Sequence, residues 1–217
     1  MAPRTDNAVS ALAVAEYFLF LASEDFTAIE PITPMKLQKL AYYAQGYSLA
    51  LHGRPLFHEP IQAWRYGPVV EPIYYAYRRH GSGAIPSPEG YDPTQLHPDI
   101  ARLLSQVYGT YGPHGAWTLS LMTHAEQPWQ DTPQNAVIAP ALMQDFFARQ
   151  LRTAAAQRQA ATAQLVTDEG GDFSELERER LIDAAIATQA LEGLTLPRDI
   201  AEEAFAAAQR RPLLDLR

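Results

Sequence analysis

Histidine is the first residue type to test for chemistry, because imidazole is both a common metal ligand and a common general base. No two histidines of this chain have the His-Glu-x-x-His spacing or the i, i+4 spacing that holds zinc on a helix. The chain also has no cysteine. We therefore predict no metal site, no cofactor and no thiol nucleophile. The six histidines are His52, His58, His80, His97, His114 and His124.

His124 and Glu126 form the pair that comes nearest to a catalytic arrangement, with Thr123 and Trp129 close by in the sequence. A histidine beside a carboxylate could support hydrolysis by general acid–base catalysis. No nucleophile motif, glycine-rich phosphate loop or partner carboxylate pair accompanies them. We favour a structural polar cluster, keep an uncharacterised hydrolase as an alternative, and predict a chain without catalytic residues that is not an enzyme.

Lys36 and Lys39 are the only lysines of the chain and lie one helical turn apart. In a helix they share a face with Tyr43, opposite a stripe of core residues that includes Leu37 and Leu40. The simplest interpretation is a solvated helix face. The functional alternative is a docking surface, in which Tyr43 supplies an aromatic contact beside two positive charges.

Composition divides the chain into parts that must position these residues. All 11 Tyr, all 3 Trp and all 6 His lie before residue 130, whereas Phe173 and Phe205 are the only aromatics after Arg149. Large rings supply much of a buried core. We predict a compact domain over residues 1–148, a connecting helix with a Gly170-Gly171 break over 149–172, and a small helical module over 173–217.

Local signals predict a mainly α fold with at most a short β element. The clearest helix begins with Thr33 as N-cap and Pro34 at the first position, and ends at Gly53. Its predicted buried face comprises Leu37, Leu40, Ala41, Ala44, Ser48 and Leu51. Residues 55–66 suit a short strand or extended loop, and 82–93 a surface loop. Other helices are predicted over 7–22, 69–80, 98–110, 114–124 and 140–165.

The third part carries its own helix signals. Ser174-x-x-Glu177 is a capping box, and the helical pattern that follows ends at Gly193, which suits a left-handed position after a helix. A last helix is predicted from about Pro197 to Gln209, with Thr195 as a possible cap.

The charge balance excludes some classes of partner. The chain has 17 Lys+Arg and 25 Asp+Glu, a net charge of −8, and a sequence pI near 5.2. Such a surface disfavours polyanions, so we predict no nucleic-acid and no membrane binding. The apolar stretch from Ala8 to Ala22 is interrupted by Glu16, unlike a signal peptide or a membrane span. We therefore expect a cytoplasmic protein.

Several of these segments together resemble the Panacea domain of SocA-like antitoxins and GepA proteins. The resemblance rests on Thr33 to Leu40, on Tyr42-Tyr43-Ala44-Gln45-Gly46, on Ala63 to Val70 with Tyr74 and Tyr77, and on Thr123-His124-x-Glu126-x-x-Trp129. It covers about residues 8–140 in order. It implies a mainly helical domain that binds toxins, or in one lineage acts as a proteolytic adaptor, and it supplies no catalytic residues.

The segment from Arg178 to Leu194 resembles the helix of VbhA-type antitoxins that inhibit Fic toxins, with the motif Ser/Thr-x-x-x-Glu-Gly/Asn. Here Thr188, Glu192 and Gly193 take the three defined positions, flanked by Leu191 and Leu194. Fic enzymes transfer AMP from ATP. The resemblance implies that Glu192 pairs with a toxin arginine that would otherwise hold the γ-phosphate, since guanidinium binds carboxylate and phosphate alike.

The leading hypothesis is an antitoxin whose C-terminal helix blocks productive ATP binding by a cognate Fic-domain toxin. In this hypothesis Thr188 and Gly193 shape the contact made by Glu192, and Leu191 and Leu194 are candidates for docking. The alternatives are a Panacea antitoxin or proteolytic adaptor for a non-Fic toxin, in which Glu192 is an ordinary solvated residue at a helix end, and the hydrolase that uses His124 and Glu126.

Overall fold

A computed structural model describes residues 8–26 and 30–167 of the chain, with side chains through residue 157. The chain divides into two units, residues 1–156 and 157–217. The described structure lies in the first unit, apart from the end of its last helix, which continues to Thr167. The predicted domain boundaries at 148/149 and 172/173 stay predictions.

The described residues are mainly helical, which confirms the predicted fold class. They contain one two-stranded sheet, β1 (Ile61–Trp64) and β2 (Gly67–Val70). The helices are α1 (Ala11–Glu24), α2 (Pro34–His52), α3 (Glu71–Tyr77), α4 (Pro98–Tyr111), α5 (Ala116–His124), α6 (Gln127–Gln130) and α7 (Pro140–Thr167), and the short 3-10 turns are η1 (Arg78–His80) and η2 (Pro93–Gln95).

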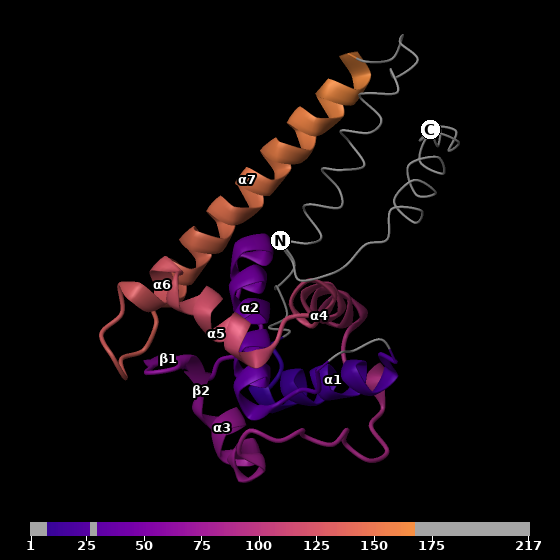
Figure 1. Cartoon of the computed structure of the whole chain (residues 1–217), viewed down its shortest axis with the longest axis vertical. Coiled ribbons are helices and arrows are strands. Elements are labelled where there is room, and N and C mark those ends of the chain that lie inside the picture. The colour runs from indigo at the N-terminus through magenta and orange to yellow at the C-terminus, as the bar shows by residue number, and fades with distance from the viewer. Residues whose placement is uncertain (1–7, 27–29, 168–217) are drawn as a thin grey trace, which may run out of the picture. The chain divides into compact units, whose positions relative to one another are not determined.

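Helix α2 is the centre of the first unit. It packs against α1, α3, α4, α5 and β2, and Figure 1 shows it upright between α4 on one side and the β-hairpin on the other. Its ends are those predicted: the Thr33 side chain accepts a hydrogen bond from the Lys36 N–H, and Gly53 follows in the left-handed region with φ 63°. The local capping residues therefore predict both ends of this helix correctly.

The β-hairpin lies beside α2 and is short but well paired. Ile61 faces Val70 and Trp64 faces Gly67 in an antiparallel register, with Arg65 and Tyr66 at the turn. On its other edge, the N–H of Ala63 donates to the Ala136 carbonyl at 2.9 Å and the N–H of Ile138 donates to the Ile61 carbonyl at 2.8 Å. The hairpin is therefore held from both sides.

Two predicted helices and one predicted buried residue need correction. The first helix begins at Ala11 because Ser10 caps it, and runs on to Glu24. The helix predicted over 69–80 begins only at Glu71, since Val69 and Val70 pair with β1. Leu51, predicted on the buried face of α2, is 51% exposed near the end of that helix.

Candidate functional site

Two glutamines of α2 fix the backbone of the segments that pass it. Gln38 donates to the Val70 carbonyl at 3.3 Å and accepts from the Val70 N–H at 2.8 Å, so its amide closes both hydrogen bonds of one β2 residue. Gln45 does the same for another segment: it donates to the Phe57 carbonyl and accepts from the Leu56 N–H. Buried backbone groups need such partners. A side chain of α2 thus holds the hairpin against this helix.

Lys39 continues this pattern. Its Nζ donates to the Pro68 carbonyl at 3.1 Å, and its side chain is 1% exposed. Burial lowers the pKa of Lys39 to about 7. Gly67, with φ 98°, makes room for this lysine, because a Cβ there would lie 2.7 Å from Nζ.

The solvated helix face predicted for Lys36, Lys39 and Tyr43 is therefore wrong. All three side chains are buried, and the Lys36 Nζ donates to the Glu30 carbonyl at 3.2 Å. Burial lowers the pKa of Lys36, while the charges of Glu30 and Asp25 act in the opposite direction. The pattern of polar and apolar residues cannot predict that a polar side chain is buried when its hydrogen-bond partner is a backbone group from a distant segment of the chain. These three residues do not form an exposed docking face in this conformation.

Tyr43 instead belongs to a buried aromatic cluster around one carboxyl group. Its ring stacks on Tyr111 with 3.7 Å between centroids, and its hydroxyl donates to Oε1 of Glu126 at 3.0 Å. Tyr111 and Tyr47 share a hydrogen bond of 2.8 Å. Burial raises the pKa of Glu126 to about 7, against the opposing effect of the hydroxyls of Tyr42 and Tyr43.

His124 lies with this cluster through Trp129. The two rings are 4.1 Å apart between centroids, and the Trp129 indole N–H donates to the Trp64 carbonyl at 3.0 Å. Burial lowers the pKa of His124, and so does the charge of Lys39. Thr123, the nearest hydroxyl in sequence, donates to the Ser120 carbonyl. This arrangement favours the structural interpretation of His124 and Glu126 over the hydrolase, because the Glu126 carboxyl accepts the hydrogen bond of Tyr43 and the half-buried His124 ring packs against Trp129.

A pocket of about 520 Å³ opens between the start of α2, the hairpin and α3. Its size suits a small ligand or a few side chains of a partner. The lining residues are Pro34, Met35, Gln38, Lys39, Trp64, Arg65, Tyr66, Val69, Tyr74, Arg78, Gly81, Gln134 and Asn135. Sequence reasoning missed it as a site, although Trp64 to Pro68 and Tyr74 were part of the Panacea resemblance. The signal was the run of aromatic and basic residues next to a Gly-Pro turn.

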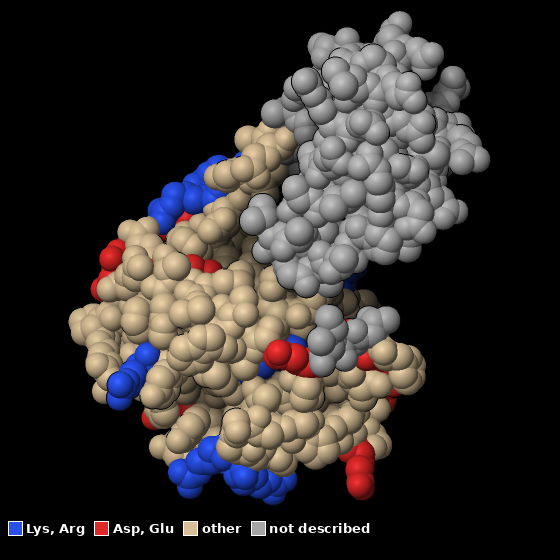
Figure 2. Space-filling view, in the orientation of Figure 1, with Lys and Arg blue, Asp and Glu red and all other residues tan. Residues whose placement is uncertain are grey.

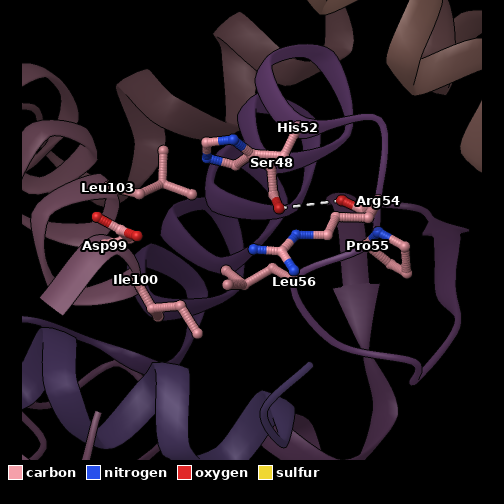
Figure 3. Close-up of a pocket in the computed structure, with 8 residues that line it drawn as sticks. All are labelled: Ser48, His52, Arg54, Pro55, Leu56, Asp99, Ile100 and Leu103. Carbon is pink, nitrogen blue, oxygen red and sulfur yellow. Dashed lines mark hydrogen bonds between the residues drawn. The ribbon is translucent and has the colours of Figure 1, made fainter. Parts of the chain in front are cut away.

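A second hollow, between α2 and α4, is much smaller. Figure 3 shows His52, Asp99 and Arg54 around it, with Ser48 Oγ donating to the Arg54 carbonyl at 3.0 Å. Its volume of about 20 Å³ is enough for one water. We assign it no function.

Other predictions concern residues that the structure describes only in part or not at all. Within them, no group of three or more His, Cys, Asp or Glu side chains could hold a metal ion, and no helix is long and apolar enough to cross a membrane. The predicted inhibitory motif, Thr188, Glu192 and Gly193, lies outside them. So do the docking candidates Leu191 and Leu194.

Comparison with known proteins finds a family match that includes most of the residues lining the pocket. Residues 37–130 match the family described as "Antitoxin SocA-like, Panacea domain". The chain is 38% identical over 84 residues to "Antitoxin SocA" of Caulobacter vibrioides (strain NA1000 / CB15N), an alignment that covers 37% of this chain and 43% of that protein. The chain thus spans less than half of this relative's length. No solved structure matches. Residues 37–130 of the chain are therefore similar to the Panacea domain of SocA-like antitoxins.

Proposed function

We propose that this protein is an antitoxin that binds and neutralises a cognate protein toxin. The observation that carries the proposal is the match of residues 37–130 to the SocA-like family, because these residues include most of α2, the hairpin and most of the pocket lining. The similarity to an antitoxin from Caulobacter vibrioides supports the same class.

The chemistry of the first unit agrees with a binding role. Its candidate acid–base groups, His124 and Glu126, are used in core packing and hydrogen bonding. Its largest described pocket combines rings with arginines, the residue types that carry most binding energy in protein interfaces.

Co-expression tests the proposal. The full chain is induced together with the product of the adjacent gene in a host in which that product alone stops growth. We expect the chain to restore growth and to co-purify with the toxic protein. A neighbour that is toxic but neither bound nor neutralised by the chain would contradict the proposal.

We further propose that the toxin is a Fic-domain enzyme and that Glu192 inhibits it. Thr188 and Glu192 are four residues apart, a spacing that would place them on the same side of the predicted helix, next to a Gly193 that suits the predicted helix end. An arginine that binds the γ-phosphate of ATP would pair equally well with the Glu192 carboxylate. ATP could then not take the orientation needed for AMP transfer.

A matched pair of variants tests the Fic mechanism. Glu192→Gln keeps the size of the side chain but removes the charge that pairs with arginine, so AMP transfer by the toxin should resume in the complex. Glu203→Gln removes one charge from the same part of the chain and should leave inhibition intact. Binding is measured separately, since other contacts can hold the complex together.

The alternative partner is a non-Fic toxin, bound directly or delivered to a protease. An adjacent gene whose product lacks an HPFxxGNGRxxR-like motif favours it, as does full growth rescue by Glu192→Gln. Either result would refute the role of Glu192 while leaving the antitoxin proposal in place.

A further inference from the structure

The pocket beside the hairpin has a charge unlike that of the whole protein. It is lined by Lys39, Arg65 and Arg78 and by no Asp or Glu, although the chain carries a net charge of −8. Basic side chains gather at the lower edge of the molecule in Figure 2, where Figure 1 places α3 and η1. A basic pocket on an acidic protein selects an acidic occupant.

The walls of the pocket are aromatic and apolar. Trp64 and Tyr74 meet edge to face with 4.9 Å between ring centroids, and Met35 and Val69 also line the pocket. At the rim, the guanidinium of Arg65 lies 5.5 Å from the centroid of the Tyr66 ring. Tyr66 is 55% exposed. Trp, Tyr, Arg and Met are enriched in protein interfaces, where buried rings and arginines dominate binding energy.

Lys39 adds a buried amino group to this lining. Its side chain is 1% exposed, and the described residues give its Nζ one hydrogen bond, to the Pro68 carbonyl. An ammonium group has three donors. A carboxylate in the pocket would offer Lys39 a partner of opposite charge.

The walls of the pocket are attached to neighbouring elements by hydrogen bonds, which favours a preformed binding site. Gln38 holds Val70, Lys39 holds Pro68, and both lie on the central helix. The N–H of Asn135 donates to the Ala63 carbonyl at 2.7 Å and fixes the segment on the far side of β1. A site that does not reorganise on binding retains more of its interaction energy.

From these features we propose that the pocket docks an acidic segment of the cognate toxin, one that packs an apolar side chain against Trp64 and Tyr74 and places carboxylates against Arg65 and Arg78, near the buried Lys39. This inference rests on the proposed antitoxin function. It names the surface of the first unit that holds the toxin, and it applies to a Fic or a non-Fic partner.

Charge reversal at the rim tests the electrostatic part. The double variant Arg65→Glu/Arg78→Glu in the full chain should weaken binding of the purified toxin by roughly tenfold to a hundredfold. The control Arg102→Glu/Arg149→Glu changes the net charge equally at exposed arginines outside the pocket and should bind like wild type. Equal melting temperatures by circular dichroism show that both variants fold.

A single aromatic substitution tests the apolar part. Tyr66→Ala should weaken toxin binding by about tenfold. Trp117→Ala removes a ring of similar exposure, 60% against 55%, that does not line the pocket, and should bind nearly as wild type does.

Cross-linking identifies the occupant directly. A photoreactive phenylalanine at position 66 of the full chain, irradiated in the purified complex, should label a toxin segment that contains both carboxylates and an apolar residue. Changing those carboxylates to lysine should restore binding to the Arg65→Glu/Arg78→Glu variant.

The outcomes separate this inference from the proposed function. A toxin that wild type neutralises and that the pocket variants bind with unchanged affinity overturns the pocket and leaves the antitoxin function standing. A chain that neutralises no toxin overturns both. Rim variants that lose self-association while retaining toxin binding make a second copy of this chain the occupant, which also contradicts the inference.

Discussion

Glu126 is a carboxyl group kept inside an aromatic core. Its Oε1 accepts the hydrogen bond of Tyr43, and burial raises its pKa from 4.5 to about 7. His124 and Glu126 are close in the sequence, and their residue types alone suggest catalysis. Their surroundings, which come from α2 and α4, assign them to packing.

This carboxyl group makes stability depend on pH. The folded chain keeps the Glu126 proton up to about pH 7, whereas the unfolded chain releases it near pH 4.5. The folded state binds more protons in this window, so its stability falls as pH rises from about 4.5 to 7, by up to about 3 kcal/mol.

Glu126→Gln should remove that contribution while keeping an acceptor for Tyr43. Urea unfolding at pH 5, 6 and 7 should therefore give a flatter profile for Glu126→Gln than for wild type. Glu89→Gln, on an exposed loop, should retain the wild-type profile. Parallel profiles for wild type and Glu126→Gln would show that the buried carboxyl is ionised throughout.

At the scale of elements, the contact between α2 and α7 depends on a glycine. Gly46 is buried in α2, and a Cβ at this position would overlap the ring of Phe147 in α7. Phe147 itself meets the rings of Tyr42, Tyr43 and Tyr47. The missing side chain is what lets α7 approach.

Gly46→Ala should therefore destabilise the fold by about 1–3 kcal/mol through overpacking, although alanine is the better helix former. Gly109→Ala provides the control, because Gly109 lies within α4 with open space around its Cβ position. Gly109→Ala should stabilise by about 0.5–1 kcal/mol. Thermal unfolding measures both; stabilisation by both would show that α7 does not approach Gly46 closely.

The elements also show what can be predicted from the sequence. Caps and breakers are local, so Thr33, Pro34 and Gly53 define α2 without knowledge of anything else. The second strand depends on pairing with β1, and the burial of Lys39 and Gln38 depends on backbone from β2. The pocket depends on the second strand and on these buried side chains. Its residues therefore carry a family resemblance in the sequence, but the sequence alone does not reveal that they form a site.

At the scale of the whole molecule, the first unit contains all three tryptophans, Trp64, Trp117 and Trp129. It also contains the described core, from Ala11 in α1 to Phe147 in α7. A unit with its own core is expected to fold independently.

A fragment of residues 1–156 should therefore unfold cooperatively, with a tryptophan-fluorescence midpoint within a few degrees of that of the full chain. The full chain, measured under the same conditions, is the reference. A fragment that fails to fold, or melts far lower, would mean that residues 157–217 are part of the same cooperative unit.

The attachment of the hairpin to α2 also determines when the docking pocket can be lost. An isolated two-stranded hairpin is at best marginally stable in water, so β1 and β2 persist because Gln38 and Lys39 hold them. Those side chains lie in the centre of the core, and releasing them requires α2 to leave its place. Fraying at the chain ends leaves the pocket intact, whereas global unfolding removes it in one step, so the binding surface has the same lifetime as the fold.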